Sequence, residues 1–214
     1  MYMHPGSEVR LDSTSGEVGN ATIAGGAIYA DHATLYADGV LGRTPGNGGG
    51  IYNDHGVVYG YGIGSALEGG GIYNDHGVVF SPSFIGGGAD RGGAIYSSGG
   101  FVSMRQGSGY IRSSANGGDI YLANGAIAEL SDFLFESNMV TESGAAIYVE
   151  SGTLRASQCH FSEGSAGDSG GAIFMAGGEA TLINCTFAGN VAAVNGAGEG
   201  GAIAIAPGAI CRLG

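Results

Sequence analysis

An eleven-residue segment occurs twice without a change, at residues 48–58 and 69–79, and reads Gly-Gly-Gly-Ile-Tyr-Asn-Asp-His-Gly-Val-Val. Looser copies of its Gly-Gly-x-Ile-Tyr part recur along most of the chain. Neighbouring copies are 21 to 30 residues apart, and their anchoring isoleucines are Ile28, Ile51, Ile72, Ile95, Ile120, Ile147, Ile173 and Ile203. A repeat of this length is typical of a solenoid, in which each repeat stacks on its neighbours.

Each repeat has the plan of a strand, a tight corner and a second strand. A glycine stands five residues after the isoleucine in all repeats but the first, which has Ala33, and an apolar residue usually follows two positions later. Apolar residues do not keep a helical spacing for more than one turn. Such short strands are stable only as stacked parallel ladders, whose connections are right-handed. The sequence therefore predicts an all-β, right-handed parallel β-helix of about eight coils of 21–30 residues.

The later repeats gain a third strand segment. Residues 133–138, 159–164 and 185–190 align without gaps, which places Phe135, Phe161 and Phe187 in one column. The early repeats lack this segment, so we expect the N-terminal half to be slimmer or less regular. We expect one elongated domain, in which residues 1–24 form a partial N-terminal coil and residues 25–214 form the β-helix repeats.

The combination of Gly-Gly-Ala-Ile with Phe-x-x-Asn resembles the double signature of the polymorphic outer membrane protein repeats of bacterial surface proteins. It is clear where Phe135-x-x-Asn138 precedes Ala145-Ala-Ile147. The glycine–isoleucine half of the resemblance covers residues 25–210, and the Phe-x-x-Asn half covers residues 133–190. The resemblance implies a β-helix of pectin-lyase type, a role in adhesion or scaffolding, and an extracellular or cell-surface location.

Charge and glycine content narrow the classes of partner. Glycine accounts for 46 of 214 residues and proline for 4, without the three-residue glycine period of collagen. The 19 acidic residues outnumber 7 arginines, and the formal net charge of −12 disfavours nucleic acid and anionic membranes as partners. No apolar run is long enough to span a bilayer, so we expect no membrane insertion, and residues 1–6 show no signal peptide.

Three consecutive corners carry the pair Asp-His, and these corners are Asp31-His32, Asp54-His55 and Asp75-His76. Stacked, they would form adjacent columns of carboxylates and imidazoles. Two imidazoles about 5 Å apart could share a transition-metal ion, with the aspartates as ligands or as hydrogen-bond partners of the histidines. Asn-Asp-x-Gly is also common turn chemistry. We expect exposed turns and no cofactor, and we keep Asp54, His55, Asp75 and His76 as the alternative metal candidates.

An aromatic residue follows the isoleucine in seven repeats. These residues are Tyr29, Tyr52, Tyr73, Tyr96, Tyr121, Tyr148 and Phe174. Strict alternation along a strand would place them on the outer face, opposite the inward isoleucines. Such a ladder stabilises stacked strands by itself, and it could also form a docking strip for a protein, a glycan or a hydrophobic ligand. We keep all seven residues as interaction candidates.

We expect a non-enzymatic structural or adhesive β-solenoid that mediates protein–protein or cell-surface interaction. A first alternative is a scaffold or linker subunit of a larger assembly, because the last coil, around Ile210, has no capping segment after it and should meet a protein partner or neighbouring subunit. A second alternative is a polysaccharide lyase or hydrolase of the same fold. Such enzymes cluster carboxylates with a cation in a groove. Here the acids from Asp119 to Asp168 are scattered, and we assign no catalytic residue.

Overall fold

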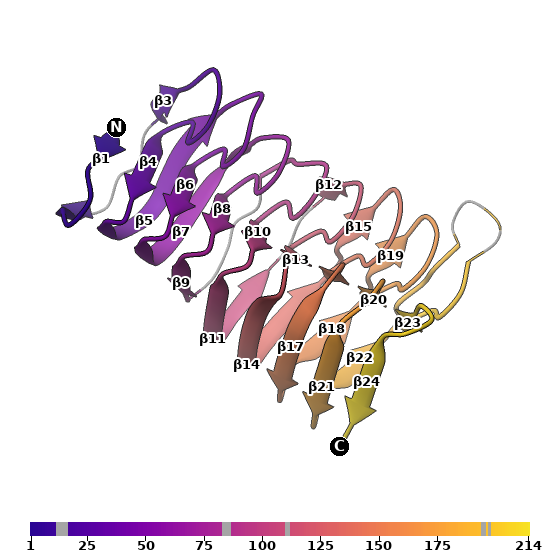
Figure 1. The fold of residues 1–214 in the computed structure, drawn as a ribbon. Helices are drawn as coiled ribbons and strands as arrows, with labels where there is room; N and C mark the ends of the chain where they lie inside the picture. Colours follow the sequence, from indigo (N-terminus) through magenta and orange to yellow (C-terminus); the bar gives the residue numbers. More distant parts are fainter. Residues whose placement is uncertain (12–16, 83–86, 110–111, 194–195, 197) are drawn as a thin grey trace.

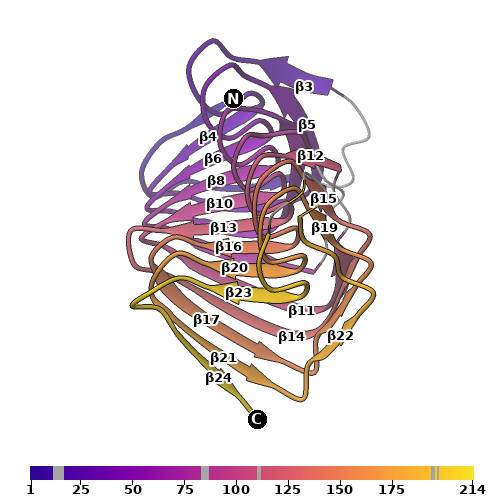
Figure 2. The same cartoon turned by 90° about the vertical axis from the view of Figure 1, so that its right-hand side faces the viewer.

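The computed structural model describes residues 1–11, 17–82, 87–109, 112–193, 196 and 198–214. Every regular element in this part of the chain is a β-strand, and all strand pairs are parallel. The strands form three sheets that wind around one axis, which Figure 1 shows from the side and Figure 2 shows turned by 90°. Eight isoleucine rungs give seven turns from Ile28 to Ile203. The predicted right-handed parallel β-helix is confirmed.

The first sheet holds the isoleucine of every repeat. Its nine strands, in spatial order, are β1 (Tyr2–Met3), β4 (Ile28–Asp31), β6 (Ile51–Asp54), β8 (Ile72–Asp75), β10 (Ile95–Ser98), β13 (Ile120–Ala123), β16 (Ile147–Val149), β20 (Ile173–Met175) and β23 (Ile203–Ile205).

The described part of the chain contains no helix that is long and apolar enough to cross a membrane.

The second sheet follows the corner and is the widest of the three. Its main path is β2 (Glu8–Leu11), β5 (Thr34–Arg43), β7 (Val57–Ser65), β9 (Val78–Ser81), β11 (Phe101–Gly109), β14 (Ala126–Glu136), β17 (Gly152–Ser157), β21 (Glu179–Ile183) and β24 (Ile210–Leu213). Beside this path lie β3 (Glu17–Asn20), β18 (His160–Ser162) and β22 (Thr186–Ala188). The third sheet consists of β12 (Arg112–Ser114), β15 (Met139–Val140) and β19 (Ser165–Ala166).

The core is a set of in-register ladders. Each isoleucine of the first sheet pairs with the isoleucine of the next coil, and the first seven are fully buried. Phe135, Phe161 and Phe187 stack with ring centroids 4.7 and 4.8 Å apart. Both columns are the ones predicted from the repeat. At the last coil, Ile203 is only half-buried and the side chains of Ile210 and Leu213 are exposed. A protein partner that covers this coil stays a prediction.

In the N-terminal half, the first two sheets approach each other backbone to backbone at glycines. A Cβ atom added to Gly49 would lie 2.3 Å from the carbonyl oxygen of Gly70 and 2.7 Å from the amide nitrogen of Ser65. In the later coils the third sheet lies at this corner, and Ala145 is buried there against Val140 and Ala166. The early coils therefore close through glycines between the first and second sheets, and a slimmer N-terminal half stays a prediction.

One acidic side chain is enclosed in this scaffold. Asp119 stands in Gly-Gly-Asp-Ile, where several other repeats have alanine, and it is fully buried. Its Oδ2 accepts a hydrogen bond of 2.6 Å from Nδ2 of Asn138, while Oδ1 has no partner in the described structure. Burial raises the pKa of Asp119 well above its ordinary value, and the hydrogen bond from Asn138 opposes this only in part.

The buried carboxyl makes stability depend on pH in a defined direction. Above about pH 4 the unfolded chain releases the Asp119 proton, whereas the folded protein keeps it, so the free energy of unfolding falls as the pH rises through this range. Asp119→Asn should flatten that fall and make the variant more stable than wild type at pH 7. Urea unfolding at several pH values measures this, with the exposed Asp132→Asn as the control. An unchanged pH dependence in Asp119→Asn would contradict the prediction.

Candidate functional site: the Tyr-Asp-His ladder and the neighbouring groove

The Asp-His pairs lie at the ends of β4, β6 and β8. The aspartates pair in register, and the histidine after each of them has a left-handed backbone, with φ of 47°, 54° and 52°. The next two coils place Gly99 (φ 67°) and Asn124 (φ 52°) at the same corner. Gly and Asn adopt this conformation at lower cost than other residues. The turn itself therefore does not require histidine.

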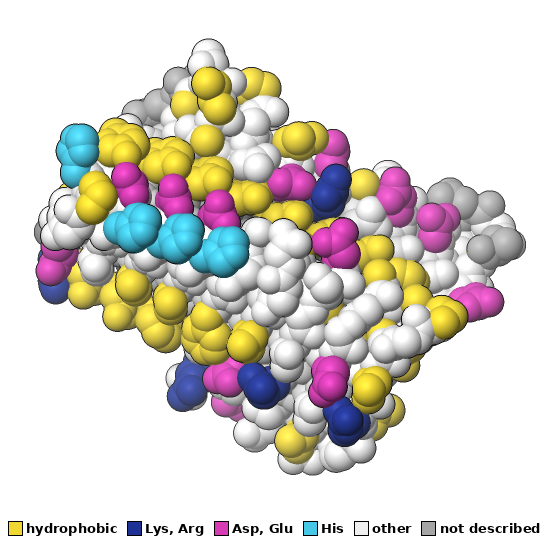
Figure 3. All heavy atoms as spheres, viewed as in Figure 1, with side chains coloured by type: hydrophobic (Ala, Val, Ile, Leu, Met, Phe, Trp, Pro, Cys, Tyr) yellow, Lys and Arg dark blue, Asp and Glu magenta, His cyan; other side chains and the backbone are white. Residues whose placement is uncertain are grey.

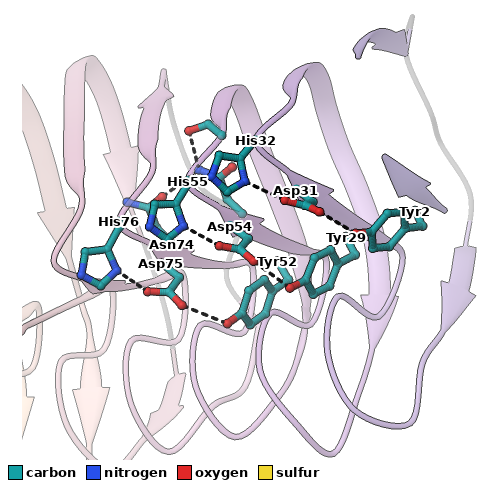
Figure 4. Close-up of polar contacts among 12 residues, drawn as sticks. Tyr2, Tyr29, Asp31, His32, Tyr52, Asp54, His55, Asn74, Asp75 and His76 are labelled. Atoms are coloured by element: carbon teal, nitrogen blue, oxygen red, sulfur yellow. Dashed lines mark hydrogen bonds and ion pairs between the residues drawn. The ribbon is translucent and has the colours of Figure 1, made fainter. Parts of the chain in front are cut away.

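Each histidine belongs to a three-residue relay that links two coils (Figure 4). The Nδ1 atoms of the three histidines lie 2.7, 2.6 and 2.6 Å from Oδ1 of the preceding aspartates. A tyrosine hydroxyl of the previous coil donates to the other carboxylate oxygen. The pairs are Tyr2–Asp31 (2.6 Å), Tyr29–Asp54 (2.9 Å) and Tyr52–Asp75 (3.3 Å).

These hydrogen bonds determine which ring nitrogen of each exposed histidine carries the proton. An ionised carboxylate only accepts hydrogen bonds, so each neutral histidine carries its proton on Nδ1 and leaves the Nε2 lone pair for a ligand. The hydrogen bond from the Tyr2 hydroxyl, followed by that of His32, lowers the pKa of Asp31. Burial and then the bond to Asp54 raise the pKa of Tyr29 to about 12. The hydrogen bonds therefore favour the ionised form of Asp31 and the protonated form of Tyr29.

The three histidines form a row on the surface, visible as the cyan side chains in Figure 3. Ring centroids are 4.9 Å apart for His32 and His55 and 5.2 Å apart for His55 and His76, and the rings are nearly parallel. The side chains of His32, His55 and His76 are 57%, 48% and 53% exposed. The histidines of these corners are therefore exposed, as predicted, whereas the aspartates beside them are half-buried.

The predicted aromatic ladder is continuous, with ring centroids 4.7 to 5.1 Å apart from Tyr29 to Phe174. Its middle is covered, because Tyr96 and Tyr121 are only 5% and 4% exposed. Arg91 lies over the Tyr121 ring, 5.8 Å from its centroid, and forms an ion pair of 3.1 Å with Glu68. An open docking strip along all seven aromatic residues is therefore not supported at Tyr96 and Tyr121.

A second aromatic ladder, which the repeat analysis missed, lies on the outer face of β5, β7 and β9. Tyr36, Tyr59 and Phe80 stack with ring centroids 4.7 and 5.0 Å apart, and Tyr59 and Phe80 are 39% and 38% exposed. The guanidinium of Arg10 closes the stack, 4.3 Å from the Tyr36 ring centroid. The signal was present in the sequence, because each of the three residues stands eight positions after its isoleucine.

This second ladder forms one wall of an open groove of about 820 Å³. Three small residues from successive coils, Ala37, Gly60 and Ser81, also line the groove. Arg10 and Arg105 lie at its two ends along the solenoid axis. No carboxylate is among the described lining residues. Figure 3 shows the hydrophobic band of this face beside the histidine row.

The candidate acids Asp119 and Glu129 lie apart, whereas Glu150 lies near the ion pair of Glu68 and Arg91. Glu129 pairs with Arg155 at 3.4 Å on the exposed face of the second sheet, and Asp119 is enclosed in the core. Within the described ranges, no three His, Cys, Asp or Glu side chains converge closely enough to hold one metal ion. The surface presents a row of imidazoles and an aromatic groove.

Comparison of the chain with protein-family models, with curated proteins and with solved structures finds no match. The resemblance to the polymorphic outer membrane protein repeats therefore stays a prediction.

Proposed function

We propose that the protein is a non-enzymatic binding solenoid that holds an extended segment of a partner protein in the groove beside Tyr36, Tyr59 and Phe80. The exposed aromatic row carries this proposal. Contiguous apolar surface on a folded protein marks an interaction site. In this role the chain would serve as an adhesive surface protein, as its resemblance implies, or as a scaffold subunit of a larger assembly.

The orientation of the rings favours a polypeptide over a glycan. Sugars bind to the open faces of aromatic rings, but the faces of this ladder are occupied by the neighbouring rings, with interplanar angles of 6° and 13°. The ladder instead presents ring edges. Beside it runs a column of half-buried outward residues, Val57, Val78 and Phe101. This ridged apolar surface suits the side chains of an extended peptide.

The charges of the groove indicate the ends of that peptide. Arg10 and Arg105 lie about four coil spacings apart, roughly 19 Å, which an extended segment of about six residues spans. No carboxylate is among the lining residues that the structure describes, whereas the whole chain has a net charge of −12. Arg10 is paired with Glu8 at 3.2 Å, and such an exposed pair contributes little and can exchange partners. The occupant is therefore an apolar segment with acidic residues at both ends.

A displayed library of random twelve-residue peptides tests this proposal. Panning on the wild-type protein, with depletion on Tyr59→Ser/Phe80→Ser, should enrich sequences with acidic residues on both sides of an apolar stretch. Binding of an enriched peptide should weaken at least tenfold in Arg105→Ser, because a charge-assisted contact is lost. Arg212→Ser is the matched control, since Arg212 is also exposed but lies outside the groove.

A glycan array probed with the same proteins separates the remaining alternatives. Saturable glycan binding that Tyr59→Ser abolishes would contradict the polypeptide proposal, and cleavage of that glycan would establish the carbohydrate-active enzyme instead. Enrichment of peptides that bind equally well to the double variant would show that the groove is not the binding site.

A further inference from the structure

The histidine row has the arrangement that prepares imidazoles for metal binding. A metal-ligating histidine typically donates its second ring N–H to a carboxylate, which fixes the tautomer and the ring orientation and makes the free nitrogen more basic. His32, His55 and His76 each make this bond through Nδ1, at 2.7, 2.6 and 2.6 Å. The aspartates are themselves held by tyrosine hydroxyls of the previous coil. Three exposed Nε2 donors are therefore presented in the same orientation.

The spacing of the rings suits a two-imidazole site. In a tetrahedral site, Zn–N bonds of about 2.0–2.1 Å place the two nitrogens about 3.4 Å apart. The nearly parallel rings are 4.9 and 5.2 Å apart, so the free edges of two neighbours have to tilt together by about 1.5–2 Å. The half-exposed side chains leave room for this tilt. Two protein ligands leave the other positions open for water or for a donor from a bound partner.

The backbone at this corner is left-handed in five successive coils, which use His three times and then Gly99 and Asn124 at the same position. His, like Asn, occurs in this conformation more often than most residues other than glycine. The corner therefore accepts several residue types, and imidazoles occupy it in three adjacent coils.

We propose that the histidine row binds one divalent ion of the Zn²⁺, Ni²⁺ and Cu²⁺ class through Nε2 of His55 and of one neighbour, His32 or His76. Imidazole nitrogen is a preferred ligand of these ions. The three aspartates beside the row add negative charge, which raises the local concentration of cations. This site is separate from the groove and does not depend on the function proposed for it.

The test uses the tag-free full chain and measures binding of NiCl₂ and ZnCl₂ by equilibrium dialysis. His55 belongs to both possible pairs, so His55→Asn should weaken binding at least tenfold. His32→Asn and His76→Asn should each keep the site, because one pair remains. Asparagine preserves the left-handed corner, as Asn124 does. Asp54→Asn should weaken binding about 10-fold to 100-fold, since the His55 Nδ1–H loses its carboxylate partner.

His160→Asn is the control, because His160 is exposed on β18, away from the row. Thermal melting of each variant establishes that it is folded. In ¹⁵N spectra of the histidine rings, the ion should shift the Nε2 resonance of His55 and leave its Nδ1 resonance on the carboxylate-bonded position. Absence of saturable binding, equal affinity in His55→Asn, or coordination through Nδ1 would each overturn the proposal.

Discussion

Ile147→Asp is expected to unfold the protein. Ile147 is fully buried in the middle of the isoleucine ladder, between Ile120 and Ile173 of the adjacent coils. The substitution removes an apolar side chain, which costs about 2–5 kcal/mol in a core, and it buries a charge that has no partner. The sum reaches the entire stability of a typical domain, about 5–15 kcal/mol. Far-UV circular dichroism and thermal melting measure the outcome.

Ile183→Asp is the matched control for this prediction. Ile183 ends β21 and its side chain is 47% exposed, so a carboxylate there stays hydrated. This variant should melt within a few degrees of wild type, because exposed substitutions usually change stability by less than about 0.5 kcal/mol. If Ile147→Asp also melted like wild type, the inward ladder would not be the main source of stability.

Gly49→Ala should have the second-largest effect, a loss of about 3 kcal/mol from overpacking. The added methyl group would meet the backbone of Gly70 and Ser65, at 2.3 and 2.7 Å, rather than the end of a flexible side chain. Both neighbours belong to stacked strands or to the corners between them, so relief of the contact has to move two coils apart. Equilibrium unfolding in urea should show a lower midpoint.

Gly201→Ala provides the control, because Gly201 precedes Ile203 by the same spacing as Gly49 precedes Ile51. Among the described residues, a Cβ atom there would find only the carbonyl oxygen of Asn190 within 4 Å, at 3.5 Å. The variant should unfold at the same urea concentration as wild type. An equal loss of stability in both variants would show that the cost comes from the backbone conformation of the repeat and not from contact between the sheets.

The fold was predictable because the relation between isoleucine, corner and second strand is constant. That relation predicts the buried column of isoleucines directly, and the three aligned Phe segments predict the buried column of phenylalanines. The burial of Tyr96 and Tyr121 was not predictable in the same way. Glu68 and Arg91 come from the corner before the isoleucine, where the repeat varies in length, and their pairing across coils depends on a register that the sequence period does not fix.

The candidate site was predictable in part. The repeated Asp-His motif predicted stacked carboxylates and imidazoles, which the structure contains. The link from the Tyr52 hydroxyl to Asp75 of the next coil was missed, because alternation along a strand says which face a side chain takes but not how far along the axis it reaches. The ladder of Tyr36, Tyr59 and Phe80 was missed for a different reason. Its members stand eight positions after their isoleucines, whereas the predicted aromatic column consists of the residues that directly follow the isoleucines.

The identical segments at 48–58 and 69–79 lie in register on neighbouring rungs, residue for residue, from Ile51 and Ile72 to Val58 and Val79. Recombination between the two gene segments that encode them would add or remove a whole coil of 21 residues while leaving every ladder aligned. Each added coil would bring one more imidazole to the row and one more ring to the wall of the groove. The number of imidazoles and aromatic rings on this face can therefore change with the length of the gene, without any change to the fold.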